Sequence, residues 1–258
     1  MSQKCHSILL DRKGNLLSEV ATLSFDFPSG HAIPEHMHPE DQLVFASAGV
    51  MTVRTSQGIW VVPPLRAVWI PAGMRHSIRT AGAVSMRTLY LIPALARKVP
   101  ARCFVMNVSP LLRELLLHAC HSPRLHKKIP AEWRLIEMIV DQLAIASSVP
   151  LQLPQPRDRR AARIVDRLIA EPGLQKTLER HCKDCGASKR TVQRLFVAQT
   201  HMTFAKWRQQ LRLLHAMQLL ASGEKVTSAA LEAGYNSTSA FISMFRKQLG
   251  KTPGRYFR

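Results

Sequence analysis

The sequence has no run of about eighteen uncharged apolar residues, which is the length that a helix needs to cross a bilayer. The residues from Met1 to His6 lead into no signal-like apolar core, so we expect a cytoplasmic protein without membrane contact. The five cysteines are an odd number and lack the spacing of a disulfide framework. Their pattern therefore favours free thiols over disulfides.

Acidic side chains are scarce, with 17 Asp and Glu against 36 Lys and Arg, and the net charge is +19. The excess is uneven, because residues 157–258 hold 20 basic and 7 acidic side chains while residues 1–156 hold 16 and 10. Such an excess is more than solubility requires, and its commonest use is to neutralise phosphates. It favours a nucleic-acid partner for the C-terminal part, although ribosomal and membrane-surface proteins share this composition.

The first hundred residues have the pattern of strands. Between Leu23 and Leu91, short apolar runs rich in Val, Ile and Thr are broken by Gly, Pro and polar pairs. This pattern predicts an all-β sandwich or barrel of eight to ten strands. Gln57-Gly58 is a natural hairpin turn, and Pro63-Pro64 ends a strand.

The apolar periodicity changes from two to 3.6 near Ser109, where Ser109-Pro110 has the composition of a helix start. A second amphipathic helix is expected from about Pro130. Both apolar faces need a partner surface, which is either the barrel or a second copy in a homodimer. Three prolines near residue 150 then indicate a linker. We expect four parts: an effector domain at 1–106, a helical coupling or dimerisation segment at 107–148, a linker at 149–157 and a basic domain at 158–258.

Three histidines accompany the predicted strands: His36, His38 and His76. Residues two apart in a strand face the same side, so the first two rings should converge, and the third can join them from an adjacent strand. Three imidazoles on one wall suit Zn, Fe, Ni or Mn. The nearby carboxylates of Glu35, Glu40 and Asp41 are expected to face solvent.

These segments resemble the two sequence motifs of the cupin family. The matching positions are Gly30, His36, His38, Gln42 and Gly49 in the first motif, and Pro71, Gly73 and His76 in the second. Gln42 stands where the family has a metal-binding Glu, and Leu65 replaces the opening Gly of the second motif. The resemblance implies a ligand site formed by His36, His38, Gln42 and His76. The three histidines either hold a divalent metal or line a metal-free pocket, in which Met51, Trp60 and Trp69 are core residues or ligand contacts.

The basic part has helical periodicity. Helices are expected at about 159–170, 175–184, 188–198, 203–221, 227–233 and 238–248. Gly186 and Gly234 each separate two of these helices, and a serine that can cap the next helix follows each glycine. Helix, glycine turn and capped helix with a polar outer face is the helix-turn-helix layout. Two such units are therefore predicted.

The string from about 160 to 257 resembles the DNA-binding domain of AraC/XylS-family transcription regulators. Its matching features include Trp207, Arg208 and Arg212 in the long helix and the run from Gly234 to Lys247. The whole chain is similar to a cupin-bearing, NimR-like subgroup of that family. The resemblance implies double-stranded DNA as partner, with base contacts from Arg190, Gln193, Arg194, Thr238, Ser239 and Ser243 and phosphate contacts from Lys189, Arg246 and Lys247. His181 departs from the family by standing at a normally apolar position, and the neighbouring Cys182 and Cys185 are expected to be structural.

Three functions are compatible with these sequence features. The first is a transcription regulator whose cupin domain senses a small molecule, with or without a metal, and controls a neighbouring operon such as a transporter gene. The second is a cupin dioxygenase or isomerase with an attached DNA-binding domain. The absence of paired carboxylates from the motifs and the presence of Gln42 argue against this enzyme. The third is a constitutive DNA-binding protein whose cupin serves only as a dimerisation scaffold.

Overall fold

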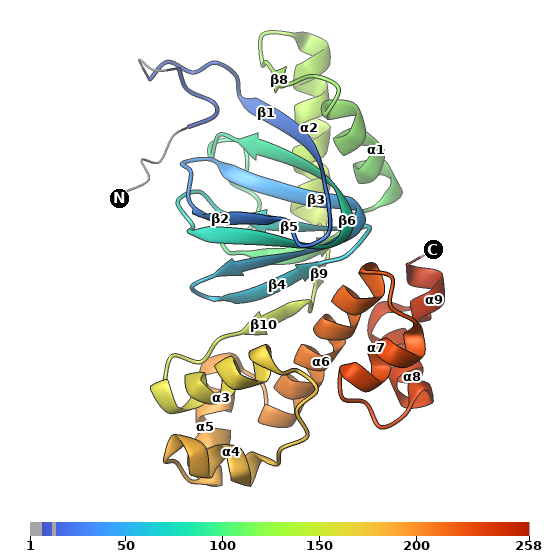
Figure 1. Ribbon diagram of the computed structural model, residues 1–258. Helices are drawn as coiled ribbons and strands as arrows, with labels where there is room; N and C mark the ends of the chain where they lie inside the picture. Colours follow the sequence, from blue (N-terminus) through green and yellow to red (C-terminus); the bar gives the residue numbers. More distant parts are fainter. Residues whose placement is uncertain (1–6, 12–13, 258) are drawn as a thin grey trace. The chain divides into compact units, whose positions relative to one another are not determined.

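The computed structural model describes residues 7–11 and 14–257 and divides the chain into two compact units (Figure 1). The first unit comprises Met1–Ser56 and Trp60–Gln152, and the second comprises Gln57–Ile59 and Leu153–Arg258. The expectations for Met1 to His6, including the thiol of Cys5, lie outside the described residues. Among the helices of the described part, none combines the length and the apolar character needed to span a bilayer.

Among the described residues one sheet has ten strands, and most of them form the first unit. Only six of the ten lie before residue 92, so the eight to ten strands expected of that stretch were too many. The central strands of the sheet are the two longest, β3 and β6, which pair antiparallel along most of their length. The order along the sheet is β8-β1-β6-β3-β5-β7-β9, while β2 also pairs with β6 and β4 with β3. The strands are β1 (Val20–Phe27), β2 (Ala32–His36), β3 (Asp41–Thr55), β4 (Gly58–Val62), β5 (Arg66–Ile70), β6 (His76–Leu91), β7 (Phe104–Asn107), β8 (Arg124–Leu125), β9 (Ser148–Val149) and β10 (Gln152–Pro154).

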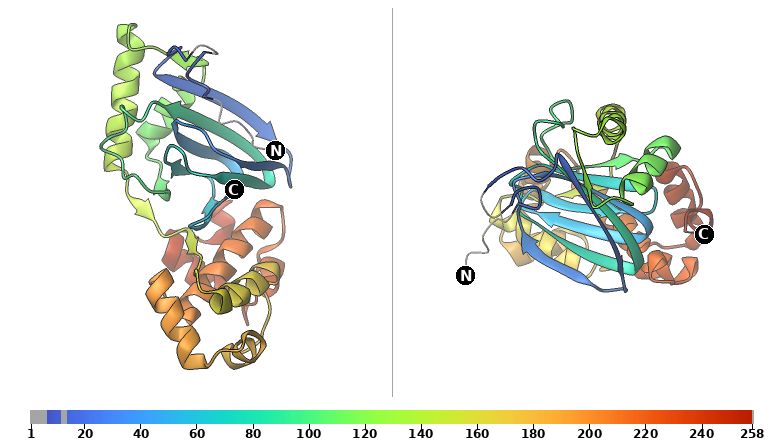
Figure 2. Two further views of the ribbon diagram at one scale, coloured as in Figure 1. Left: turned by 90° about the vertical axis from the view of Figure 1, so that its left-hand side faces the viewer. Right: turned by 90° about the horizontal axis from the view of Figure 1, so that it is seen from above.

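Helices α1 (Pro110–Ala119) and α2 (Pro130–Ile145) cover one face of this sheet (Figure 2). Ser109 caps α1 by accepting a hydrogen bond from the Leu112 backbone, as the sequence predicted. Sheet residues such as Leu43 and Leu89 pack in one core cluster with buried residues of both helices. The sheet is thus one partner of the apolar helix faces.

Side chains alternate between the two faces of the sheet along β3 and β6, so the residues next to Leu43 and Leu89 point to the opposite face. Gln42, Thr88 and Tyr90 meet there through hydrogen bonds, next to fully buried Val44. This inner face carries the candidate effector site. The predicted linker begins at the last residue of β9 and contains the short strand β10. Leu151 is buried within it, so this segment is extended and partly packed.

The second unit is all-helical, so the predicted class of an all-β domain followed by an all-α domain is confirmed. Six helices agree with the predicted ones, except that α4 begins three residues late because Thr177 caps it. The short α9 was not predicted. The helices are α3 (Arg159–Ala170), α4 (Leu178–Cys185), α5 (Lys189–Thr200), α6 (Phe204–Ala221), α7 (Val226–Glu232), α8 (Thr238–Leu249) and α9 (Pro253–Tyr256).

Aromatic side chains form the core of this unit. Phe196 of α5 meets Phe204 and Trp207 of α6 edge to face, with ring centroids 5.2 and 5.6 Å apart. Phe241 and Phe245, one turn apart in α8, are fully buried and pack edge to face. These contacts fix which face of α5 and of α8 points inward, and therefore which face meets solvent.

Candidate functional site

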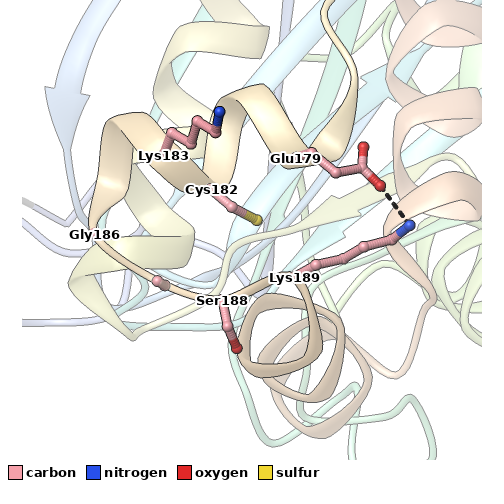
Figure 3. Close-up of a pocket in the computed structure, with 7 residues that line it drawn as sticks. Glu179, Cys182, Lys183, Gly186, Ser188 and Lys189 are labelled. Atoms are coloured by element: carbon pink, nitrogen blue, oxygen red, sulfur yellow. Dashed lines mark hydrogen bonds and ion pairs between the residues drawn. The ribbon is translucent and has the colours of Figure 1, made fainter.

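The first helix-turn-helix joins α4 to α5 through a left-handed glycine. Gly186 ends α4 with φ of +68°, a conformation that glycine adopts without steric cost. Ser188 then caps α5 by accepting a hydrogen bond from the Thr191 backbone at 3.1 Å. A hollow of about 410 Å³ lies at this turn. Figure 3 shows Lys189 reaching back to an ion pair with Glu179 there. The hydrogen bond from Lys189 lowers the pKa of the Glu179 carboxyl and ties the first turn of α4 to the start of α5.

The outer face of α5 carries the predicted base-reading side chains. Val192 and Phe196 are buried, whereas Arg190, Gln193 and Arg194 are exposed. Arginine can form bidentate hydrogen bonds with guanine, and glutamine with adenine. The helix thus presents two guanidinium groups and one amide to solvent beside the turn.

The second helix-turn-helix joins α7 to α8 through Gly234, whose φ is +84°. Ser237 caps α8 by accepting a hydrogen bond from the Ala240 backbone at 3.2 Å. On α8, Ser239, Ser243, Arg246 and Lys247 are exposed and Thr238 is half-buried. This face therefore offers hydroxyl groups and two cations at its C-terminal end.

A hydrogen-bond network, which the sequence did not predict, connects the two helix-turn-helix units. Arg208 of α6 donates to the backbone carbonyl of Lys176 at 2.9 Å, and Arg212 donates to Oε1 of Gln175 at 3.3 Å. The Gln175 amide in turn donates to the carbonyl of Gly234 at 3.0 Å. The α3–α4 loop is thereby tied to α6 and to the turn of the second unit. Only the long-range contacts reveal this role.

His181 of α4 is buried at 1 % exposure, and neither of its ring nitrogens has a hydrogen-bond partner within the described residues. Burial lowers the pKa of this imidazole, and the nearby Arg208 guanidinium adds to the effect. Cys182 and Cys185 are buried as well, and burial raises the pKa of the Cys182 thiol. The four described cysteines are free. The two thiols of α4 are packing residues, as expected.

The structure brings the three predicted histidines of the first unit together. His36 ends β2, His76 opens β6, and the two residues pair across these strands. His38 lies in the loop after β2 and not in the strand. The prediction that strand alternation brings its ring beside that of His36 was therefore wrong, although the rings do converge. One ring nitrogen from each of the three residues lies within 4.8 Å of the other two. His76 and His38 are buried, while His36 is half-buried.

Each of these three rings is oriented by a backbone carbonyl two residues away. A carbonyl oxygen only accepts, so each Nδ1 carries a proton, which leaves Nε2 of a neutral ring free to act as a metal ligand. Burial also lowers the pKa values of His38 and His76, the latter to about 4. The Nδ1 to oxygen distances are 2.8 Å for His36 to Pro34, 2.9 Å for His38 to Glu40 and 2.9 Å for His76 to Met74.

Gln42 completes the cluster from the inner face of β3. Its Oε1 lies 3.2 Å from Nε2 of His38, and its Nε2 donates to Oγ1 of Thr88 at 3.0 Å and to the Tyr90 hydroxyl at 2.9 Å. Thr88 donates its own proton to the carbonyl of Leu43, so its oxygen must accept from the amide. This contact fixes the orientation of the Gln42 amide, with the oxygen toward His38.

The prediction that the neighbouring carboxylates face solvent is correct for Glu35 and wrong for Glu40 and Asp41. Glu40 is 2 % exposed and accepts hydrogen bonds from the backbone of Ile8 at 3.1 Å and Leu9 at 3.4 Å. Asp41 accepts from the backbone of Ala72, and burial raises the pKa of its carboxyl. Both carboxylates hold the loop that carries His38 through backbone amides, although Oε2 of Glu40 is buried without a hydrogen-bond partner within the described residues.

Four further positions named with the cupin resemblance are also located by the structure. Leu65, which stands where the family has Gly, adopts φ of +61°. The turn thus keeps the left-handed backbone without the residue that suits it. Met51, Trp60 and Trp69 are fully buried, which places them in the core of the first unit.

A β-rich domain with a converging polar cluster, followed by a helical domain with two capped helix-turn-helix units, defines a ligand-responsive DNA-binding regulator. Comparison with family models finds the same two kinds of domain in the same order, although the first match extends through α3. The AraC-like ligand binding domain matches residues 22–172, and a helix-turn-helix domain matches residues 181–258. The chain belongs to the AraC family of transcription regulators.

One relative that matches this chain over most of its length supports this family assignment. The HTH-type transcriptional regulator NimR of Escherichia coli (strain K12) is 36 % identical over 223 residues, which cover 86 % of this chain and 81 % of NimR. RipA of Corynebacterium diphtheriae is 34 % identical over 107 residues, or 42 % of this chain and 31 % of RipA. Among solved structures, the DNA-binding domain of AdpA in complex with a target DNA is 29 % identical, covers 40 % of this chain and 90 % of that one, and has a TM-score of 0.36.

Proposed function

We propose that this regulator reads double-stranded DNA with α5 and α8 and responds to a small ligand bound by His36, His38, Gln42 and His76. The observation that carries the proposal is the pair of serine-capped helices with polar outer faces, tied together through Gln175. The regulator acts in the cytoplasm, where its DNA lies. Control of a neighbouring operon, such as a transporter gene, fits this role.

The length of α6 supports simultaneous docking of both units. Its 18 residues correspond to about 27 Å at 1.5 Å per residue. One turn of DNA is about 34 Å long, a span that two units can reach once side chains and offset docking are added. Arg190, Gln193 and Arg194 supply the base contacts of the first unit, and Thr238, Ser239 and Ser243 those of the second. Lys189, Arg246 and Lys247 bind phosphates.

The first unit also offers a surface for a second copy of the chain. Met138 and Ile145 of α2 are 45 % and 76 % exposed. A cavity of about 760 Å³ adjoins this helix and includes Leu95, Trp133 and Val140 among its lining residues. Apolar groups on an otherwise polar helix face favour association, so a homodimer through α2 is part of the proposal.

Two substitutions test the DNA-reading role. Arg194→Ala should weaken binding to the operator by about 1–3 kcal/mol and relax preference at one or two base pairs. Lys247→Ala should weaken binding to all sequences alike and reduce the salt dependence, because a phosphate contact carries no sequence information. Binding is measured by fluorescence anisotropy on DNA from upstream of the chain's own gene and on random DNA. Equal loss on both DNAs for Arg194→Ala would contradict base reading.

The competing functions make different predictions. A cupin metalloenzyme would turn over a substrate in the metal-loaded state, whereas a regulator needs no turnover, and the relatives are named as transcriptional regulators. A constitutive binder would keep the same DNA affinity with every ligand. The double substitution His36→Ala with His76→Ala should abolish the ligand response and leave DNA affinity without ligand intact. Collapse of that affinity would make these residues structural.

A further inference from the structure

The histidine cluster presents more lone pairs than donors. His36, His38 and His76 each donate Nδ1–H to a carbonyl, which leaves Nε2 of each neutral ring as an acceptor, and one ring nitrogen of each lies within 4.8 Å of the other two. Nε2 of His76 is buried and has no hydrogen-bond partner within the described part of the chain. An unpartnered buried acceptor is unfavourable, and a hydrogen bond from the opposite ring nitrogen is the arrangement found in metal-binding histidines. The cluster therefore has the form of a site for a cation.

Gln42 adds a fourth acceptor. Its Oε1 faces Nε2 of His38 at 3.2 Å, and its amide protons are directed away to Thr88 and Tyr90. With this orientation of the amide and a neutral imidazole, both atoms are acceptors that a cation beside them would satisfy. Donors bound to one transition ion at about 2.1 Å lie roughly 3–3.5 Å from each other. The spacing of this pair fits that geometry, and the possible ligand atoms of the three histidines lie within 4.8 Å of one another.

The inner face beside Gln42 is already filled. Ile70 lies directly opposite Gln42 on β5, and Val44 lies opposite Val68, so all four share one face. The three apolar side chains are fully buried. The cluster thus adjoins packed apolar groups on this side and meets solvent through half-buried His36. Such surroundings suit an ion better than a bulky organic molecule.

We infer that a divalent first-row transition ion, bound by His36, His38, His76 and Gln42, is itself the effector that this regulator senses. The inference rests on the proposed function and names the ligand of the same site. Imidazole donors suit Co²⁺, Ni²⁺ and Zn²⁺. A neutral amide in place of a carboxylate weakens the attraction for the ion, so the ion can exchange with its surroundings, as a sensor requires.

Metal binding to the full chain tests the site. The protein is freed of metal with a chelator and titrated with Co²⁺, and binding is followed by the visible absorption of the ion and by metal analysis. We expect one ion per chain, at least tenfold weaker binding for His36→Ala and for Gln42→Leu, and tighter binding for Gln42→Glu. The matched control is His118→Ala, which removes an exposed imidazole that lies beside His121 on the surface of the first unit. This control should leave metal binding at the His36 cluster unchanged. Affinity that responds to the control but not to Gln42 or His36 would overturn the inference.

DNA binding then separates sensing from mere metal binding. Anisotropy on the upstream DNA is measured with and without Co²⁺ or Zn²⁺, and we expect a change in Kd of at least fivefold for the wild type and none for His36→Ala. Gln42→Leu provides the same comparison if His36→Ala loses DNA affinity without metal. Metal binding that leaves the Kd unchanged would refute the ion as effector while the proposed function stands. Failure to bind upstream DNA with or without metal would instead refute the proposed function.

Discussion

Replacing His181 with leucine should stabilise the second unit. The imidazole is 1 % exposed, and both of its nitrogens lack a partner within the described residues. An unsatisfied buried polar group costs about 1–3 kcal/mol. Leucine is apolar, has a comparable size and faces Phe204, whose ring centroid lies 6.4 Å from that of His181. We therefore expect His181→Leu to raise the free energy of unfolding by about 2 kcal/mol.

The same substitution should remove part of the acid sensitivity. Burial depresses the folded-state pKa of His181 below its unfolded value of 6.5, so the unfolded chain takes up the proton first. The stability linked to this group is fully present above pH 6.5 and is lost as the pH falls below it. His215, whose pKa burial also lowers, leaves a residual acid effect in both proteins.

Thermal unfolding and hydrogen exchange of α4 to α6, at pH 7.5 and pH 5.5, measure both effects. At pH 7.5 a gain of about 2 kcal/mol corresponds to a rise of roughly 10 °C in the melting temperature of a unit of this size. The control is His201→Asn, which removes an exposed imidazole at a left-handed position that Asn tolerates. Unchanged or reduced stability of His181→Leu at pH 7.5 would refute the reasoning, as would an undiminished loss at pH 5.5.

Three further substitutions test local features. Leu65→Gly should raise the free energy of unfolding of the first unit by up to about 1 kcal/mol, because relief of the φ of +61° outweighs the entropy of glycine. Denaturant unfolding measures this, and a lower free energy of unfolding would mean that the half-exposed leucine side chain packs well. Gly173→Ala should weaken DNA binding, because the new Cβ would lie 2.3 Å from the carbonyl oxygen of Glu232 and disturb the contact between the two helix-turn-helix units; unchanged operator affinity would show that this contact is dispensable. Ser188→Ala should destabilise α5 by about 1 kcal/mol through loss of its cap. Hydrogen exchange at the start of α5 should become faster, and an unchanged exchange rate would mean that the cap is unimportant.

Local chemistry made much of the fold predictable. Serine caps, left-handed glycines and apolar periodicity act over a few residues, so Ser109, Ser188, Ser237 and the turn at Gly234 could be placed from the sequence. The exposed face of α5 followed in the same way, because burying Val192 and Phe196 forces Arg190 and Arg194 outward. The error at His38 arose because β2 ends two residues earlier than alternation assumed.

The sequence by itself determined the class of each domain, the position of both recognition helices and the three histidines of the cluster, since motif spacing and periodicity are properties of neighbouring residues. Tertiary structure alone decided the burial of Glu40, the orientation of the Gln42 amide and the contact between Gln175 and Gly234. Each of these depends on groups from 31 to 59 residues away in the chain. No local pattern encodes which distant donor will satisfy a buried acceptor, so those contacts become known only when the chain is folded.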